Sequence, residues 1–216
     1  MRAAIFLAVT LLVFSQAWGE DPELDKVLDA HCKARAGLVS LRASFTQTTV
    51  FTLFDESEEA SGEFAFLKPG RIKWSFTSPD SSLTVIDGES AWTVLPHIRQ
   101  VQKVTLGGSS TDRVMSIIGF GSCGAEMRED FEITLKGEED GLIILDMVPT
   151  SDDIAPYFST IELGLDPGSY LPVKIVFHEH SGDLMVFEFS DLTPGAQVDA
   201  GEFEFSVPEG YELIEY

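Results

Sequence analysis

The sequence predicts one mainly β domain, an antiparallel sheet or barrel of about eleven strands with one opening helix and short apolar inserts. From Ser40 onward, apolar and polar residues alternate over short runs, which is typical of strands with one buried face. Turn-forming residues such as Lys68-Pro69-Gly70 and Asp87-Gly88 separate these runs. No repeat, low-complexity tract or proline-rich linker divides the chain, so we expect a single domain over residues 20–216.

Composition supports a packed core and excludes some partners. The 216 residues are 44% hydrophobic and include 16 Phe, which is enough to bury a core. Asp and Glu number 36 against 14 Lys and Arg, giving a formal charge of -22. Nucleic acid and anionic membrane surfaces would repel such a chain, so we expect no nucleic-acid partner. A solvated, self-repelling surface is the simplest account of the acidity, although basic partners are compatible with it.

The first nineteen residues are typical of a secretory signal peptide. Arg2 precedes an apolar run over residues 3–14, and Ala17-Trp18-Gly19 forms a small-x-small cleavage site before Glu20. The apolar run is shorter than the roughly 20 residues that span a bilayer. No Cys follows the cleavage site, so we expect an exported chain without a lipid anchor.

The mature chain opens with an amphipathic helix. Asp21-Pro22 is a capping pair, and apolar residues from Leu24 to Leu28 recur at helical spacing until Gly37. A strand is expected over 40–53, followed by an acidic turn over 55–59. The other predicted strands are 62–68, 72–76, 83–86, 91–95, 100–106, 131–135, 142–148, 160–165, 172–178, 184–191 and 203–206.

Two apolar inserts interrupt the strands. A short helix is predicted after Gly107-Gly108, running to Phe120, and an irregular insert over 152–158. Both carry large apolar side chains although one face of the sheet already has its core. They are either extra core or a movable lid over a cavity for a hydrophobic ligand, and the residues alone leave both open.

The chemical motifs do not indicate an enzyme. Residues 119–124 match the dinucleotide pattern G-x-G-x-x-G but lack a βαβ unit, so we expect a hinge there. His178 and His180 share a strand face and would bracket a metal, but neighbouring ligands are missing and a solvated face is preferred. No serine occupies a nucleophile elbow. We therefore predict no catalytic residue, no metal and no cofactor.

Cys32 and Cys123 are the only cysteines. An exported chain permits a disulfide between them without demanding one. Two separate buried thiols are the alternative.

Several stretches form a specific pattern in their order and spacing. They are Leu38-Val-Ser-Leu41-Arg-Ala-Ser-Phe45-Thr-Gln47, Gly62-Glu-Phe64-Ala-Phe66-Leu-Lys68-Pro69-Gly-Arg-Ile-Lys-Trp74, Pro79-Asp80, Asp87-Gly88-Glu-Ser-Ala-Trp92 and Phe203-Glu-Phe205-Ser-Val-Pro208-Glu-Gly210. This pattern resembles the LolA family of periplasmic outer-membrane lipoprotein carriers. The likeness runs from the first helix to the last predicted strand.

The resemblance implies an incomplete, strongly curved antiparallel β-barrel whose helices form a lid. It implies a monomeric periplasmic carrier, not an enzyme. Such a carrier takes acylated lipoproteins from an inner-membrane ATP-binding-cassette release complex and hands them to an outer-membrane receptor. The alternative is a periplasmic module of the same fold that binds a free lipid or glycolipid.

The resemblance also implies site residues. Those of the apolar cavity and its mouth are Phe45, Phe64, Phe66, Ile72, Trp74, Phe76 and Trp92. Those of the lid are Val114, Ile117, Ile118, Phe120, Ile154 and Phe158. The family latches its lid with an arginine before a proline, where this chain has Lys68. A lysine offers a point charge in place of a planar fork, so we expect a weaker latch, or else an ordinary solvated lysine.

Overall fold

The computed structural model describes residues 21–106, 118–121, 124 and 126–216. The predicted signal peptide lies outside these residues. Helix α1 spans Pro22–Ala36, where the sequence predicts it. The carboxylate of Asp21 caps it by accepting hydrogen bonds from the backbone N–H groups of Glu23 and Leu24, at 3.0 and 3.3 Å. The helix buries Leu24, Leu28 and His31 against the sheet.

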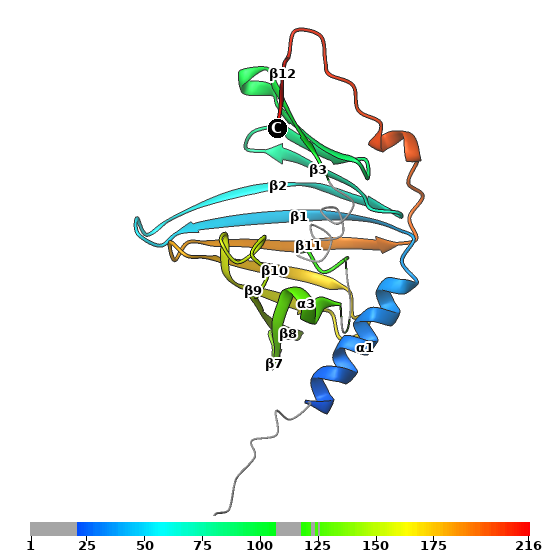
Figure 1. The fold of residues 1–216 in the computed structure, drawn as a ribbon, viewed down its shortest axis with the longest axis vertical. Coiled ribbons are helices and arrows are strands. Elements are labelled where there is room, and N and C mark those ends of the chain that lie inside the picture. The colour runs from blue at the N-terminus through cyan, green and yellow to red at the C-terminus, as the bar shows by residue number, and fades with distance from the viewer. Residues whose placement is uncertain (1–20, 107–117, 122–123, 125) are drawn as a thin grey trace, which may run out of the picture.

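Twelve strands form one open sheet in the order β12-β6-β5-β4-β3-β2-β1-β11-β10-β9-β8-β7. Two meanders, β1 to β6 and β7 to β11, are joined where β1 pairs with β11, as Figure 1 shows. The strands are β1 (Ser40–Phe51), β2 (Glu56–Leu67), β3 (Arg71–Ser78), β4 (Ser82–Ile86), β5 (Ser90–Leu95), β6 (Gln100–Thr105), β7 (Phe131–Glu139), β8 (Leu142–Pro149), β9 (Phe158–Leu165), β10 (Pro172–Glu179), β11 (Leu184–Pro194) and β12 (Glu212–Glu215). The predicted mainly β, incompletely closed architecture is confirmed.

The turn after the first strand differs from the prediction. The predicted acidic turn over 55–59 is wrong, because the β1–β2 ladder continues down to the pair Phe51 and Glu56. Glu56, Glu58 and Glu59 therefore belong to β2, with their side chains in solvent. In this arrangement water solvates the carboxylates, while the backbone groups form the hydrogen bonds of the β1–β2 ladder.

The predicted strand over 203–206 is also wrong. A short 3-10 helix occupies Ala200–Phe203, capped by the side chain of Asp199, and the last strand is β12. Phe203 is buried and Phe205 packs beside it, so packing accounts for their alternation without strand pairing. β12 pairs with β6 in parallel, whereas the other strand pairs are antiparallel.

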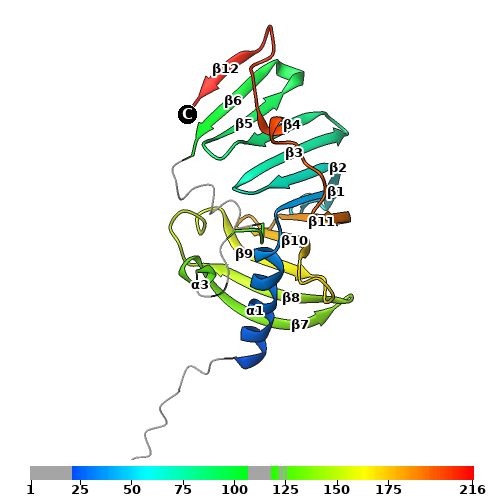
Figure 2. The same cartoon turned by 90° about the vertical axis from the view of Figure 1, so that its right-hand side faces the viewer.

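The two faces of the sheet carry different cores. We call inner the face that α1, residues 118–121 and α3 (Met127–Asp130) cover, and it holds the large apolar cluster. The outer face of β2 to β5 carries a small cluster around Ala65, Val85 and Phe203, under the C-terminal segment. Figure 2 shows α1 and α3 on one side of the sheet and the chain that leads to β12 running along the strand ends.

Candidate functional site: an apolar chamber on the inner face

Aromatic rings line the inner face of the central strands. Phe45 lies 5.4 Å from Trp74, 4.9 Å from Phe76 and 6.1 Å from Phe187, measured between ring centroids. Phe64 lies 4.8 Å from Trp74, its cross-strand partner. Most of these pairs meet edge to face, which is the favourable arrangement for aromatic rings. We call aromatic cluster the set Phe45, Phe64, Phe66, Trp74, Phe76, Phe187 and Phe189.

A glycine makes room for the central ring. Gly62 pairs with Phe45 on one side and with Phe76 on the other, at a register shift in β2. A Cβ atom at this position would lie 1.9 Å from the carbonyl oxygen of Ser75 and 2.9 Å from the Phe45 ring. Only glycine therefore lets the chain pass beneath the ring of Phe45.

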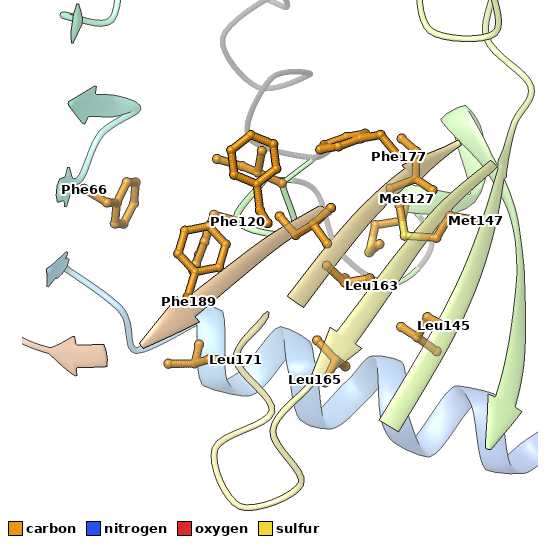
Figure 3. Packing of buried hydrophobic residues seen from close by; sticks show 14 of the residues in the cluster. Phe66, Phe120, Met127, Leu145, Met147, Leu163, Leu165, Leu171, Phe177 and Phe189 are labelled. Atoms are coloured by element: carbon orange, nitrogen blue, oxygen red, sulfur yellow. The ribbon is translucent and has the colours of Figure 1, made fainter. Parts of the chain in front are cut away.

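Residues from the two predicted inserts cover the cluster. Phe120 stacks on Phe64 and Phe66, with centroid distances of 5.9 and 6.1 Å and interplanar angles of 23° and 20°. Figure 3 shows Phe120 among Phe66, Phe189 and Phe177. Ile118 and Ile154 are buried in the large apolar cluster of the inner face, and Phe158 packs against that cluster. We call apolar chamber the part of the inner face around the aromatic cluster. The chain's own side chains fill it.

Gly119 lets the chain pack tightly between these side chains. Its φ of +76° belongs to the left-handed region that favours glycine. A Cβ atom there would lie 3.0 Å from Leu163 and 3.1 Å from Pro172. Gly124 also has a positive φ, of +60°.

Two basic side chains link the β2–β3 turn, α1 and residues 118–121, which we call the cover. The ammonium of Lys68 donates to the backbone carbonyls of Arg35 and Ala36, at 3.3 and 3.0 Å. These carbonyls end α1, where a cation also meets the negative end of the helix dipole. The guanidinium of Arg35 in turn donates to the carbonyl of Phe120, at 3.5 Å. Lys68 thus contacts α1, and Arg35, which the sequence did not single out, contacts the cover itself.

An open cavity of about 630 Å³ lies beside these contacts. Arg35, Lys68 and the β2–β3 turn line one part of it, and Glu126, Glu129 and Asp130 line another. Phe66 and Phe120 also line it, so the cavity reaches the edge of the aromatic cluster. It lies between the residues that hold the cover and the short helix α3.

His31 anchors the middle of α1. It is fully buried, and its Nδ1–H donates to the carbonyl of Tyr170 at 2.9 Å, in the turn between β9 and β10. Burial lowers the pKa of His31 below 6.5, an effect that Arg35 reinforces and that the backbone groups of Tyr170 and Gly119 oppose. His31 is therefore held neutral where α1, the β9–β10 turn and the 118–121 segment meet.

The structure does not bring all predicted site residues together. Phe45, Phe64, Phe66, Ile72, Trp74 and Phe76 gather on the inner face. Trp92 lies on the outer face, 5.1 Å from Phe205, with the Lys103 ammonium over its ring and its indole N–H donating to Asp87. Val114, Ile117 and Cys123 lie outside the described residues. Phe187 and Phe189, which the site prediction omitted, come from the alternating apolar run of β11.

Cys32 and the two strand histidines have separate surroundings. Cys32 is half-buried on α1, and its Sγ lies 3.6 Å from the position of a Cβ on Gly124, next to Cys123 in the chain. The Nε2 atom of His178 lies 2.7 Å from Oε1 of Glu162, whereas Nε2 of His180 lies 2.8 Å from the carbonyl oxygen of Ala155. These two histidines therefore do not share a ligand. Among the described residues, no cluster of three or more His, Cys, Asp or Glu side chains is arranged to hold a metal ion.

The sequence matches a known protein family. The family model described as "Outer membrane lipoprotein carrier protein LolA" matches residues 36–206. The chain belongs to the LolA family. A relative from Alkalilimnicola ehrlichii, named outer-membrane lipoprotein carrier protein, is 32% identical over 82% of this chain and 78% of its own length. One of the same name from Bordetella bronchiseptica is 30% identical over 98% of this chain and 94% of its own.

A solved structure shares the fold of this chain. An uncharacterised conserved protein from Thermus thermophilus superposes with a TM-score of 0.59 at 14% identity, over 90% of this chain and 99% of its own. This likeness concerns the fold alone. Within the described part of the chain, no helix has the length and apolar character needed to cross a membrane.

Proposed function

We propose that this LolA family member is a non-enzymatic periplasmic carrier of acylated lipoproteins. Its inner face shields the acyl chains between an inner-membrane ATP-binding-cassette release complex and an outer-membrane receptor. The protein acts as a monomer and needs no cofactor or nucleic acid. The observation that carries the proposal is the aromatic cluster, over which Phe120 stacks while Arg35 donates to the Phe120 carbonyl.

The energetics favour such a chamber. An exposed acyl chain costs roughly 0.8 kcal/mol per methylene in water, so a lipoprotein with several chains needs an apolar shelter to cross an aqueous compartment. The side chains of Ile118, Phe120 and Ile154 occupy that shelter in the empty protein. When cargo displaces these side chains, the acyl chains make apolar contacts in their place. Because the buried apolar area changes little, neither loading nor release has a large free-energy cost.

The testing experiment is lipoprotein release from spheroplasts. The mature protein should release a triacylated lipoprotein into the supernatant as a one-to-one complex, and an unrelated acidic periplasmic protein is the control. Release no greater than that of the control contradicts the proposal. Phospholipid or glycolipid that copurifies with the protein, without lipoprotein release, would instead support a free-lipid binding module.

Access to the chamber can be tested separately. Phe120→Ala removes the ring that stacks on Phe64 and Phe66, so it should raise the uptake of an apolar dye. Tyr157→Ala is the matched control, because Tyr157 belongs to the other insert and is 67% exposed. Equal dye uptake by the two variants would contradict the role of Phe120 as a cover.

A further inference from the structure

The inner face of the sheet changes its chemistry at Trp74. In the register of the strands, Trp74 lies opposite Phe64 on β2 and opposite Thr84 on β4. Thr84 lies opposite Thr93, and Thr93 opposite Gln102. Residues directly opposite one another in a sheet point to the same face. The row therefore runs from the aromatic cluster onto polar side chains of the same face.

We call polar strip the three residues Thr84, Thr93 and Gln102. Each is half-buried. The hydroxyls of Thr84 and Thr93 lie 3.2 Å apart, and the amide of Gln102 donates to Gln100 at 3.1 Å. The strip thus presents hydroxyl and amide groups with no charge, beside a wall of aromatic rings.

Between β3 and β5 the neighbouring rows of the inner face are uncharged as well, and the carboxylate of Glu212, opposite Gln100, belongs to the edge strand β12. One row places Phe76 opposite Ser82, and the other places Ile86 opposite Ala91. Cationic Lys103 belongs to the outer face, where it lies over the ring of Trp92. A ligand on the strip therefore meets neutral hydrogen-bonding groups, which suits a neutral head group and not a carboxylate.

The indole N–H of Trp74 stands at the border between rings and strip. Its nitrogen is enclosed and has no hydrogen-bond partner in the described part of the chain. Four rings surround the indole edge to face, those of Phe45, Phe64, Phe187 and Phe189. A buried donor without an acceptor is costly, and a phenyl ring would fill the same wall without that cost. The unmet donor points to an acceptor that arrives with a ligand.

Exposure on this face of β3 is greater at Trp74 and Phe76 than at Ile72. Ile72 is buried, whereas Trp74 and Phe76 are half-buried. The indole thus lies where the closed apolar part of the chamber gives way to its more open part. The polar end of an acyl chain belongs at such a border, because the chain prefers the rings and its head prefers polar groups.

We propose that Trp74 donates its indole hydrogen to the carbonyl oxygen of an acyl ester, and that the polar strip receives the neutral group esterified to it. This inference rests on the proposed carrier function and names the chemistry that the chamber recognises. An ester carbonyl is the first strong acceptor that follows a hydrocarbon chain. It is therefore the acceptor that a chain lying on the aromatic cluster would bring to Trp74.

Two ligands that differ only in that carbonyl test the inference. They are 1-palmitoylglycerol and its ether analogue 1-O-hexadecylglycerol, each used below its micellar concentration. Their affinities are measured by displacement of N-phenyl-1-naphthylamine from the mature protein. Trp74→Phe removes the donor and keeps an aromatic ring. Trp92→Phe makes the same change on the outer face and is the matched control.

The natural protein should bind the ester about two- to tenfold more tightly than the ether, which corresponds to about 0.4–1.4 kcal/mol for one neutral hydrogen bond. Trp74→Phe should bring this ratio close to one while changing the affinity for the ether less than twofold. Trp92→Phe should keep the natural ratio. Thr84→Val should weaken both ligands, because they share the glycerol head, and leave their ratio unchanged.

A spectroscopic measurement keeps the test independent of folding defects in Trp74→Phe. The chain from Glu20 contains only Trp74 and Trp92, so in the Trp92→Phe variant all tryptophan emission comes from Trp74. The ester should shift this emission to longer wavelength relative to the ether, because only the ester brings a carbonyl acceptor to the indole.

The outcomes separate the two proposals. Binding of both ligands with equal affinity, or a preference for the ester that survives in Trp74→Phe, overturns the inference and leaves the carrier function intact. Binding of neither ligand, together with no lipoprotein release from spheroplasts, overturns both.

Discussion

Lys68 donates a hydrogen bond to the backbone carbonyl of Arg35, the residue whose side chain donates to the carbonyl of Phe120. The two basic residues thus act in series, from the β2–β3 turn through the end of α1 to the cover of the chamber. The family resemblance implies that Lys68 holds the lid directly, and an ordinary solvated lysine is the alternative. The structure instead places its ammonium on α1, which makes its proposed effect on the lid indirect.

Replacing Lys68 tests this arrangement. Lys68→Leu removes both hydrogen bonds to the end of α1 and should lower the stability of the empty protein by about 0.5–1 kcal/mol. Lys68→Arg should restore or strengthen the contact, because its fork has five donors. Thermal unfolding and transfer of bound lipoprotein to a membrane-anchored receptor measure the two effects.

Lys33→Leu is the matched control, because exposed Lys33 lies in the same last turn of α1. It removes a charge from the helix end without touching the β2–β3 turn. Equal stability and equal transfer rates for the natural protein, Lys68→Leu and Lys68→Arg would leave Lys68 as an ordinary surface residue.

Gly119→Ala should loosen the cover. The new methyl group meets Leu163 and Pro172 at 3.0–3.1 Å and adds strain at a φ of +76°. We expect a loss of about 1–3 kcal/mol in stability and a higher uptake of apolar dye. Gly141→Ala adds similar strain at a φ of +80° but meets nothing within 4 Å. If both variants take up dye equally, close packing at Gly119 does not control access.

His31 should make stability depend on pH. Its pKa in the folded protein lies below 6.5, so the unfolded chain binds the proton more readily. Its effect on stability is therefore small above about pH 6.5 and becomes destabilising as the pH falls below that value, levelling off at the folded pKa. Urea unfolding between pH 7.5 and 5.5 measures this slope.

His31→Gln should flatten the slope, because an amide replaces the titrating ring and can still donate to Tyr170. His97→Gln, the same change at an exposed position, is the matched control. An identical slope in all three proteins would show that another group carries the pH dependence.

The disulfide between the two cysteines stays a prediction. Cys32 lies beside Gly124, so the chain comes close to it one residue after Cys123. A bridge would tie α1 to the segment that covers the chamber, and closing so long a loop is worth roughly 4–5 kcal/mol in the chain-entropy model. Titration of thiols in the denatured, nonreduced protein decides it: no reactive thiol supports the bridge, and two exclude it.

Local patterns predicted α1 and the strands of both meanders, because each depends on periodicity and turn residues close in sequence. They missed β12, a four-residue strand whose partner β6 is about a hundred residues away. The family resemblance placed Trp92 in the chamber. Alternation shows that Ala91 and Trp92 face opposite sides, but only the pairing of Ala91 with Ile86 shows which side is inner.

The interaction of Arg35 could not be predicted for a different reason. A basic residue in the last turn of a helix is common, because it complements the helix dipole. Its contact with Phe120 depends on where the chain returns some 85 residues later. The aromatic residues of the chamber could therefore be predicted from the sequence, whereas the hydrogen bond from Arg35 to Phe120 could not.

The pairing of β12 with β6 also protects one edge of the sheet. The backbone groups along that edge of β6 find their partners in residues 212–215. Without β12 this edge would be open, the kind of surface that recruits strands from other molecules. Four residues of β12, with the ion pair between Glu215 and Lys103, thus act as a guard against association through this edge.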